Sequence, residues 1–503
     1  MLKRRMDFLF VVILIVCIYI VFFTGYSQTM KIMAIVGYSL ILFISIFSLM
    51  LENRSAPHTL MWMYVLLVFP VAGYFFYLFS GQLYLKGYLY KSKRIRDRDQ
   101  WEKLMRREES RDLSFLTENQ LCFAKYAKNA TMTPITTASR VKILKNGDET
   151  FSELKQKLRE AEKFIHMEYY IFRSDRLGKE IIDILITKAK HGVEVLFLFD
   201  AAGSMKIDAA DIKNMQHAGI QAAPFSPLKY GFFNQKFNFR NHRKIVIIDG
   251  EIGFVGGLNV GVEYLGEDEK IGFWRDTHMM LTGEAVYTLH NVFLLDWEYV
   301  NHEKILAHQV AEKKLHESDE LDGAVQVVPS GPDTQQGIMS DFYYTMMSCA
   351  TKSIWIATPY FVPDEAIRTA LRVAAAKGIE VRIIVPEIND SFLTQYASRS
   401  YFSELLRNGA EIYLYKKGFL HQKVIIVDGN IASIGTANMD MRSFHLNFEV
   451  NVFLFGSSSI RDLVAHYEQD LEDSAKLSPV QYYKRGLRER TKESFARLFS
   501  GVL

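Results

Sequence analysis

The first 80 residues contain three apolar runs that are almost free of charged side chains. These runs cover residues 8–24, 32–51 and 59–79. Each is close to the roughly 20 residues that a helix needs to cross the hydrocarbon core of a bilayer. We therefore predict a transmembrane helical anchor over residues 1–80 and a multi-pass protein of the cell membrane.

From residue 136 onward the pattern changes to short apolar strands that alternate with amphipathic helices, and it runs through twice. Strand-like segments at 164–171 and 193–199 enclose a helix, and the segments at 353–361 and 379–385 repeat that arrangement. Such alternation is typical of an α/β fold with covered sheet faces. We predict two repeats, at 136–325 and 326–480, with mainly parallel sheets flanked by helices and a pseudo-twofold relationship.

Positive charge is concentrated between the anchor and the first repeat. The formal net charge of +3 is too small to indicate nucleic-acid binding, but residues 86–111 are rich in Lys and Arg. The predicted linker at 81–135 is either a solvated helix or a juxtamembrane segment attracted to anionic lipid headgroups, and its position favours the second. It includes Lys91, Lys93, Arg94, Arg96, Arg98, Arg106 and Arg107.

The positive-inside rule places the domain that follows this linker on the cytoplasmic side. Lys3, Arg4 and Arg5 favour the same side for the N-terminus. Three membrane crossings would put the N-terminus and the linker on opposite sides, so they cannot place both basic clusters in the cytoplasm. Either the N-terminus lies outside, or the first apolar segment does not cross completely.

The three cysteines, Cys17, Cys122 and Cys349, lie far apart and form no C-x-x-C pair. This spacing favours core or lipid-facing thiols over a disulfide framework or a zinc site. The sequence also contains no carboxylate–histidine cluster with metal spacing and no glycine-rich phosphate loop. We therefore predict that the protein needs neither a metal nor another cofactor.

Both repeats contain the same motif, H-x-K-x4-D-x6-G-x-x-N. A lone H-x-K would mean little, but identical spacing at the matching place in two repeats is not expected by chance. The first copy consists of His242, Lys244, Asp249, Gly256 and Asn259, and the second of His421, Lys423, Asp428, Gly435 and Asn438.

The spacing within the motif has a mechanical meaning. Residues i and i+2 of a strand point to the same face, so the His and Lys side chains emerge together. The four apolar residues that follow are typical of buried sheet, and the Asp then ends the strand in a turn with a glycine. For Asp249 and Asp428, holding this turn is at least as well supported as a direct chemical role. A second hairpin edge with nearby donors is predicted at Gly256, Asn259, Gly435 and Asn438.

Packing the two repeats together would bring two imidazoles and two ammonium groups face to face. This set can exchange phosphodiesters: one neutral histidine attacks phosphorus, the other protonates the leaving alcohol, and the lysines hold the phosphoryl oxygens. Asp276 and Glu449 follow the motifs in apolar surroundings and would orient the histidines. The alternative is that they pair with Arg275 or Arg442 on a surface strand.

These residues resemble the phospholipase D superfamily and, within it, the bacterial cardiolipin synthases. Besides the two motifs, the resemblance rests on an N-terminal membrane anchor and on the stretches Glu-Tyr-Tyr-Ile from Glu168, Ser-Gly-Pro-Asp from Ser330, Thr-Pro-Tyr-Phe-Val-Pro-Asp-Glu from Thr358 and Arg-Ser-Phe-His-Leu-Asn-Phe-Glu from Arg442. The family more usually has a two-helix anchor, so the extra segment at 8–24 leaves the topology open.

The resemblance implies that two phosphatidylglycerol molecules are joined into cardiolipin, with release of glycerol, through a phosphatidyl-histidine. It assigns the nucleophile to His242 and the acid to His421, and the reverse remains open. The membrane lipids phosphatidylglycerol and cardiolipin are then the expected partners, without nucleic acid. The oligomeric state stays undetermined, with a dimer among the options.

Aromatic residues give two candidates for an apolar lip that keeps water from competing with the acceptor. One is the insertion at 225–239, which contains Tyr230, Phe232 and Phe233, and the other is the segment 396–402. Both are equally well read as core. The tail at 481–503 alternates Lys and Arg with apolar residues, which suits an amphipathic membrane-surface helix or one packed on the domain.

The rival functions are a phosphodiester hydrolase of the same superfamily, another phosphatidyltransferase, and a non-catalytic membrane scaffold. The intact residues of both motifs argue against the scaffold.

Overall fold

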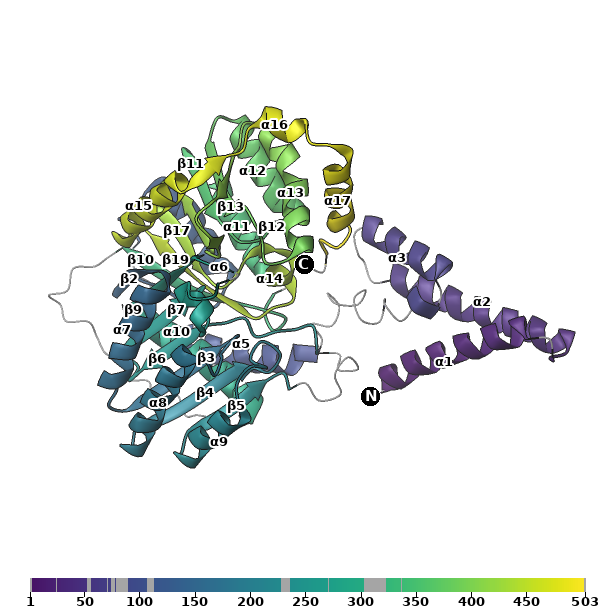
Figure 1. Cartoon of the computed structure of the whole chain (residues 1–503), viewed down its shortest axis with the longest axis horizontal. Helices are drawn as coiled ribbons and strands as arrows, with labels where there is room; N and C mark the ends of the chain where they lie inside the picture. Colours follow the sequence, from purple (N-terminus) through teal and green to yellow (C-terminus); the bar gives the residue numbers. More distant parts are fainter. Residues whose placement is uncertain are drawn as a thin grey trace. The chain divides into compact units, whose positions relative to one another are not determined.

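A computed structural model describes residues 2–23, 25–51, 56–69, 71–73, 77, 89–105, 113–227, 236–269, 271–302, 323–335 and 337–501. The chain forms two compact units, Met1–Leu89 and Tyr90–Leu503 (Figure 1). The first is helical, and the second contains both repeats.

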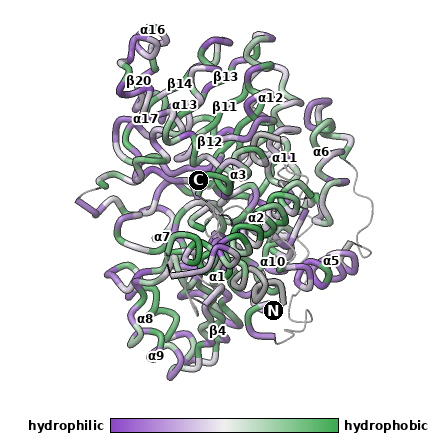
Figure 2. The backbone as a smooth tube through the Cα atoms, turned by 90° about the vertical axis from the view of Figure 1, so that its right-hand side faces the viewer, coloured by the Kyte–Doolittle hydropathy of each residue, from purple (hydrophilic) through white to green (hydrophobic). Residues whose placement is uncertain are grey.

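The N-terminal unit consists of α1 (Leu2–Phe22), α2 (Gln28–Met50) and α3 (Ala56–Val68). The side chain of Ser27 caps α2 by accepting the N–H of Met30 at 3.3 Å, which satisfies one of the free donors of the first turn. A small core joins the helices through Leu14, Ile41 and Leu66. Most other apolar side chains of the unit are exposed, and hydrophobic residues predominate in α2 (Figure 2).

Within the described residues, α2 is the one helix that is both long enough and apolar enough to cross a membrane. The apolar part of α1 spans Val12–Phe22, and that of α3 spans Thr59–Val68, so both are shorter. In the predicted third run, residues 70, 74–76, 78 and 79 lie outside the described residues. One spanning helix is therefore supported, and the multi-pass anchor stays a prediction.

Each repeat of the second unit is built on one large mixed sheet. The first sheet has the order β2-β9-β7-β6-β3-β4-β5, and the second the order β1-β10-β19-β17-β16-β11-β13-β14-β20. Corresponding strands occupy corresponding places, which confirms the predicted duplication. The strands of the first sheet are β2 (Ser139–Lys145), β3 (Phe164–Tyr169), β4 (Glu194–Asp200), β5 (Gln221–Phe225), β6 (Ile245–Ile248), β7 (Ile252–Gly256) and β9 (Thr277–Gly283).

The second sheet adds two short edge strands, β1 (Ile135–Thr136) and β20 (Ser474–Lys476), to the common pattern. Its other strands are β10 (Ala324–Ser330), β11 (Ser353–Ala357), β13 (Glu380–Pro386), β14 (Glu411–Tyr415), β16 (Val424–Val427), β17 (Ile431–Gly435) and β19 (Glu449–Phe455). Because β1 precedes the first repeat and joins the sheet of the second, the two repeats are tied together by the chain itself.

The prediction of mainly parallel sheets was wrong. Among the described strands, only β3–β4 and β4–β5 are parallel in the first sheet, and only β11–β13 and β13–β14 in the second. The remaining pairings are antiparallel. The reason lies in the motif, since the tight turn that follows its aspartate can join only antiparallel neighbours, as in β6–β7 and β16–β17.

Helices pack on both sheets through apolar faces (Figure 1). Helices α7 (Asn146–Glu160), α8 (Arg176–Lys190) and α9 (Ala209–His217) bury residues with the first sheet, and α11 (Ile338–Ser348), α12 (Glu365–Ala376) and α13 (Phe392–Arg407) do so with the second. Helices α10 (Glu284–Asn301) and α15 (Ser459–Glu472) each contact strands of both sheets. These two helices therefore connect the two sheets, each of which has its own hydrophobic core.

Two helices from the predicted linker belong to the second unit. These are α5 (Lys91–Met105) and α6 (Glu118–Ala130). Lys93 of α5 is buried and ion-paired, so the prediction that it is attracted to lipid headgroups was wrong for this residue. Lys91, Arg94 and Arg98 are exposed, while Arg106 and Arg107 lie outside the described residues.

Cys122 and Cys349 form a disulfide, contrary to the expectation of free thiols. The two residues are 227 positions apart in sequence, but their Cα atoms are 6.2 Å apart because α6 packs against α11. Sequence spacing carries no signal of such a contact. Cys17 is a free, buried thiol, as predicted.

The C-terminal tail packs on the domain. It contains α16 (Pro479–Tyr483) and α17 (Leu487–Arg497), and α17 contacts α13. The Tyr482 ring and Ala496 enter the core of the second repeat.

The segment at 396–402, one of the two candidates for an apolar lip, contributes Tyr401 and Phe402 to that core, which favours the structural reading of its aromatics. The other lip candidates, Tyr230, Phe232 and Phe233, lie outside the described residues.

Candidate active site

The two motif histidines and lysines are brought together where the repeats meet. His242 and Lys244 immediately precede β6, and His421 and Lys423 immediately precede β16. All four side chains are buried. The positive charge of Lys423 acts on His242, and that of Lys244 acts on His421, so the two motifs share one electrostatic environment.

A short backbone pairing between the repeats positions both histidines. Strand β15 (Phe419–Leu420), which leads into the second motif, runs parallel to β8 (Trp274–Arg275) of the first repeat. The N–H of His421 then donates to the carbonyl of Arg275 at 2.7 Å. In the other half, the N–H of His242 donates to the carbonyl of Phe448 at 2.9 Å.

Because of this pairing, each histidine faces an acid from the opposite repeat. Asp276 follows Arg275, and its Oδ2 lies 2.7 Å from Nδ1 of His421. Glu449 follows Phe448, and its Oε2 lies 2.9 Å from Nδ1 of His242. Both acids are fully buried, which excludes the alternative of surface ion pairs.

The acids determine which ring nitrogen is available for chemistry. A carboxylate can only accept a hydrogen bond, so each histidine donates through Nδ1–H and keeps the lone pair on Nε2. Burial lowers the pKa of His242 to about 4 and that of His421 to about 3, and the neighbouring lysines act in the same direction. Both imidazoles are therefore neutral near pH 7.

The lysines are buried beside the histidines. Nζ of Lys244 donates to the carbonyl of His242 at 2.6 Å, and Nζ of Lys423 lies 2.9 Å from Nδ1 and 3.1 Å from Nε2 of His421. Burial lowers the pKa of Lys244 to about 7 and that of Lys423 to about 8, despite the nearby acids. An anion that entered the site would stabilise both ammonium charges.

The two acids stay ionised in spite of complete burial. Burial alone would raise the pKa of Asp276, but the positive charge of Lys423 and the hydrogen bonds from His421 and the N–H of Thr277 outweigh burial, and the net pKa is lowered. The same holds for Glu449 beside His242 and Lys244. The site therefore places two buried carboxylates behind two imidazoles and two ammonium groups.

The motif aspartates lie at the opposite ends of their strands. At about 3.3 Å per residue, Asp249 and Asp428 are roughly 20 Å along the chain from the motif histidines. Asp249 accepts the backbone N–H groups of residues 162–164 at 2.7 to 2.9 Å, and Asp428 accepts those of residues 351–353 at 2.7 to 2.8 Å. Both adopt positive φ, 55° and 52°. These contacts support the turn-holding role.

The motif glycines allow close approach of neighbouring strands. A Cβ on Gly256 would lie 2.6 Å from the Cα of His278, and one on Gly435 would lie 2.4 Å from Oδ1 of Asn451. Asn259 accepts the N–H of Ile171 at 3.0 Å, while Asn438 is buried beside Asp440. These residues shape the loops around the site, and the described contacts do not direct their amides toward the histidines.

Two aromatic neighbours of the histidines were not predicted as site residues. The Tyr170 ring lies 4.9 Å from the His242 ring and 5.3 Å from Nζ of Lys244. The Trp274 ring lies 5.0 Å from the His421 ring. Trp274 precedes the orienting acid by two residues and therefore shares its strand face, which is the signal that could have identified it.

Arg243, the residue between His242 and Lys244, extends in the other direction into a buried ionic cluster. Its guanidinium donates to the carbonyl of Ser330 at 3.1 Å and pairs with Asp296. Lys93 contacts Asp296 at 3.0 Å and Asp333 at 2.6 Å. The cluster joins α5, α10 and the second repeat behind the first motif. Burial lowers the pKa of Lys93, but the negative charges of the neighbouring aspartates outweigh burial, and the net pKa is raised.

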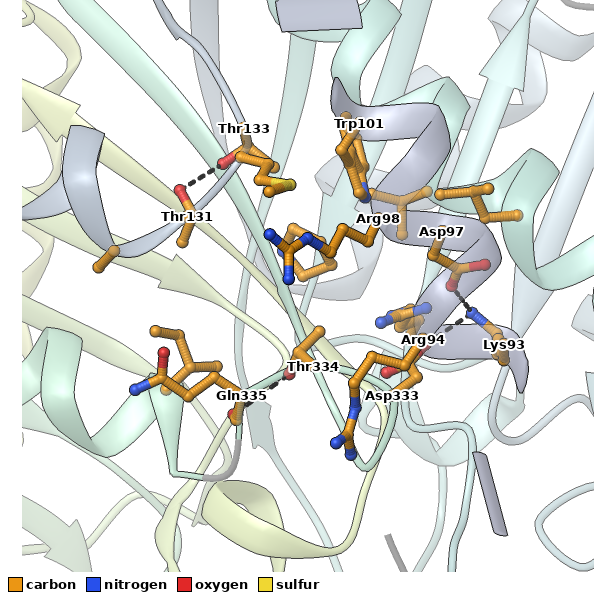
Figure 3. A pocket seen from close by; sticks show the side chains of 17 residues that line it. Lys93, Arg94, Asp97, Arg98, Trp101, Thr131, Thr133, Asp333, Thr334 and Gln335 are labelled. Carbon is orange, nitrogen blue, oxygen red and sulfur yellow. Dashed lines mark hydrogen bonds and ion pairs between the residues drawn. The ribbon is translucent and has the colours of Figure 1, made fainter. Parts of the chain in front are cut away.

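A cavity of about 320 Å³ lies beside this cluster (Figure 3). Arg94, Arg98 and Trp101 of α5 form one wall, and Thr334 and Gln335 lie on another. It shares Arg243 with the first motif but contains none of the four motif His and Lys side chains.

A second cavity, of about 390 Å³, lies next to His421. Its wall includes Trp274 and Phe419, whose rings lie 5.0 and 5.7 Å from the His421 ring. Polar groups also line it, including Arg173, Glu263, Asn389 and Asp390, beside three isoleucines. The charge of Lys423 acts on Asp390, which places this cavity within the electrostatic field of the second motif.

Across the described residues, no three His, Cys, Asp or Glu side chains lie close enough together to form a metal site.

Sequence comparisons identify close relatives of the chain. A family profile described as "Cardiolipin synthase, PLD-like domain" matches residues 154–297 and 343–473, which contain both motifs. The chain is 57% identical over its full length to a probable cardiolipin synthase of Bacillus subtilis, all of which is covered. It is 48% identical over 463 residues to cardiolipin synthase 2 of Bacillus anthracis, covering 90% of this chain and 88% of that protein.

The fold also matches a solved structure. A phosphatidylserine synthase from Haemophilus influenzae superposes with a TM-score of 0.55 at 17% identity, over 76% of this chain and 100% of that one. At this identity the match supports the fold alone. The duplicated sheets, the composite site and the full-length sequence similarity together show that the chain belongs to the cardiolipin synthase family of phospholipase D-like phosphatidyltransferases.

Proposed function

We propose that the protein joins two phosphatidylglycerol molecules into cardiolipin and glycerol through a phosphatidyl-histidine. The observation that carries this proposal is the trans arrangement of the site, in which each histidine is oriented by an acid of the other repeat. Two imidazoles in equivalent settings can provide one nucleophile and one acid for a single phosphorus. The lipid substrate is inferred from the relatives, which are named as cardiolipin synthases.

In the first step, Nε2 of His242 attacks the phosphorus of one phosphatidylglycerol. The bond between phosphorus and the glycerol headgroup breaks, and protonated His421 gives its proton to the departing glycerol oxygen. Burial and the two lysines lower the pKa of His421, and the negative charge of the bound phosphodiester opposes this effect and stabilises the protonated state. Lys244 and Lys423 stabilise the phosphoryl oxygens.

In the second step, the hydroxyl of the second phosphatidylglycerol attacks the phosphatidyl-histidine. Neutral His421 accepts the hydroxyl proton as the new phosphorus–oxygen bond forms and the phosphorus–nitrogen bond breaks. One phosphodiester is exchanged for another, so the step needs no external energy source. The assignment of His242 as nucleophile follows the family resemblance, and the near symmetry of the site also accommodates the reverse.

The cavity beside His421 is our candidate for the glycerol headgroup. It adjoins the proposed acid–base histidine through Trp274 and Phe419, and Asn389 and Asp390 offer hydrogen-bonding groups to a polyol. Asp276, Glu449 and the aromatic neighbours Tyr170 and Trp274 are proposed to position the histidines. Asp249 and Asp428 are proposed to hold the turns behind them.

We also propose that the N-terminal unit anchors the protein in the cell membrane with the second unit on the cytoplasmic side. The exposed apolar side chains of α1, α2 and α3 and the spanning length of α2 support the anchor. The basic residues that precede and start α5 support the cytoplasmic side. Inaccessibility of α5 to a membrane-impermeant label in intact cells, and access after lysis, would support this topology.

Product analysis with the purified full chain tests the activity. Detergent micelles of radiolabelled phosphatidylglycerol should yield cardiolipin and glycerol in equal amounts, with or without a chelator. Phosphatidic acid without cardiolipin would instead identify a hydrolase. Loss of activity in chelator that magnesium or zinc restores would contradict the metal-free mechanism.

A further inference from the structure

The helix α17 holds an apolar face outward although its opposite face is firmly packed. Leu487, Phe495 and Leu498 are 78%, 53% and 73% exposed. They lie at positions i, i+8 and i+11, which places them on one face of the helix and its last turn. The same C-terminal segment also exposes Val480 and Phe499.

The opposite face fixes the orientation of α17. Glu493 and Ala496 are buried, and Arg485 holds Glu493 through contacts of 2.7 to 3.0 Å. Lys492 donates to the Tyr396 hydroxyl at 3.0 Å. A rotation that buried the leucines would break these contacts. The apolar exposure is therefore built into the fold.

Positive side chains flank this apolar face. Arg488, Arg490 and Arg497 are exposed, and at about 100° per residue Arg488 falls on one side of the stripe and the other two on the opposite side. The two acids of the segment, Glu489 and Glu493, are already paired with Lys492 and Arg485. Arg497 also lies over the Tyr401 ring at 4.8 Å, which keeps its positive charge. An apolar stripe between cations matches the surface of an anionic bilayer in both polarity and charge.

We propose that α17 docks the second unit onto an anionic phospholipid bilayer, with Leu487, Phe495 and Leu498 inserted at the headgroup level. The surface leads toward the candidate active site. Tyr396, which accepts the hydrogen bond from Lys492, lies 4.6 Å from the exposed Phe392 ring, and Phe392 closely follows the cavity residues Ile388 and Asp390. The docked surface would therefore bring the cavity mouth to the lipid.

A fluorescent probe tests the insertion directly. The full chain carries Cys17→Ser, which removes its one free thiol, and NBD on Leu498→Cys. Labelling is done without reductant so that the native disulfide stays closed, and the protein is reconstituted into vesicles with or without phosphatidylglycerol. We expect a blue shift and quenching by a nitroxide-labelled lipid in the anionic vesicles. The matched control, Gln216→Cys on the exposed face of α9, should stay in water.

Two outcomes would overturn the proposal. One is a water-exposed probe at position 498 in anionic vesicles. The other is a blue shift that the lipid nitroxide does not quench, because an apolar environment without lipid contact indicates a protein partner or a second copy. Equal insertion of the probe in neutral vesicles would refute the proposed attraction of the arginines to anionic lipid.

A kinetic test separates docking from chemistry. Arg488→Gln with Arg490→Gln should lower cardiolipin formation in vesicles, since each arginine shifts the docked-to-free ratio about fivefold. Leu487→Ser with Leu498→Ser should do the same. Neither pair should change turnover in detergent micelles, and these exposed substitutions should leave folding intact. Absence of cardiolipin from the unmodified protein in micelles would refute the proposed function, whereas equal losses in micelles and vesicles would refute docking alone.

Discussion

Glu449→Gln should disable the site without changing its shape. The Oε2–Nδ1 contact of 2.9 Å joins a fully buried, ionised carboxylate to His242, and the amide keeps the volume but loses the charge. A hydrogen bond to a charged group contributes about 1.5–3 kcal/mol. At about 1.4 kcal/mol per tenfold change in rate, we expect kcat/KM for phosphatidylglycerol to fall about 10- to 150-fold.

The assay is initial-rate cardiolipin formation in mixed micelles, with thermal unfolding as a check on the fold. Asp276→Asn should give a comparable loss through His421. The control Glu153→Gln removes an acid of an exposed ion pair with Lys142 and should change the rate less than twofold.

A double mutant decides whether Glu449 acts through His242. If it does, Glu449→Gln should cost nothing further in a His242→Ala background. A loss below threefold in the single mutant, or a large additional loss in the double mutant, would refute the reasoning.

Four other predictions follow from the site and its supports. His242→Ala and His421→Ala should each abolish turnover in the product assay, and substantial activity in either would contradict one composite site. Because His421, with a pKa of about 3, must take up a proton before the leaving alcohol departs, kcat/KM should decline with pH from about pH 4 upward, and it should decline more steeply above about pH 7 to 8, where Lys244 and Lys423 lose their protons; an unchanged slope between pH 6 and 10 would refute the role of the lysines. Asp428→Ala should lower the free energy of unfolding by about 2–4 kcal/mol while folded molecules remain active, and loss of activity without loss of stability would assign it a chemical role. Denatured, unreduced protein should show one reactive thiol, Cys17, and reduced protein three; three thiols in both would contradict the disulfide.

The sequence predicted the features that depend on local pattern. Alternation along a strand was enough to place His242 with Lys244 and His421 with Lys423. Repeated spacing was enough to predict the duplication. The positive φ of Asp249 and Asp428 also agrees with the turn that Asp-Gly predicts.

The features that were missed depend on contacts between distant segments. Periodicity does not distinguish the parallel from the antiparallel neighbours of a buried strand, so the sheets were predicted as mainly parallel. The disulfide between Cys122 and Cys349 depends on the packing of α6 against α11, and the burial of Lys93 depends on acids more than 200 residues away. A charged residue in a basic stretch has no local signal that distinguishes a buried partner from solvent.

Pairing between the repeats also decided which acid serves which histidine. The sequence identified Asp276 and Glu449 as orienting acids but could not assign the partners. The backbone contact of His421 with Arg275, and of His242 with Phe448, makes that assignment.

This exchange of acids has a consequence for how such a protein can arise and mature. A single ancestral repeat would carry a histidine and an acid that could not reach each other within one copy, so it would need a second copy before it could react. Gene fusion would then make permanent a partnership that already existed. During synthesis the first repeat would emerge with an unoriented His242, and this histidine would acquire its Nδ1–H tautomer only after residue 449 has been made and folded. The membrane would thus meet a competent enzyme only once nearly the whole chain is in place.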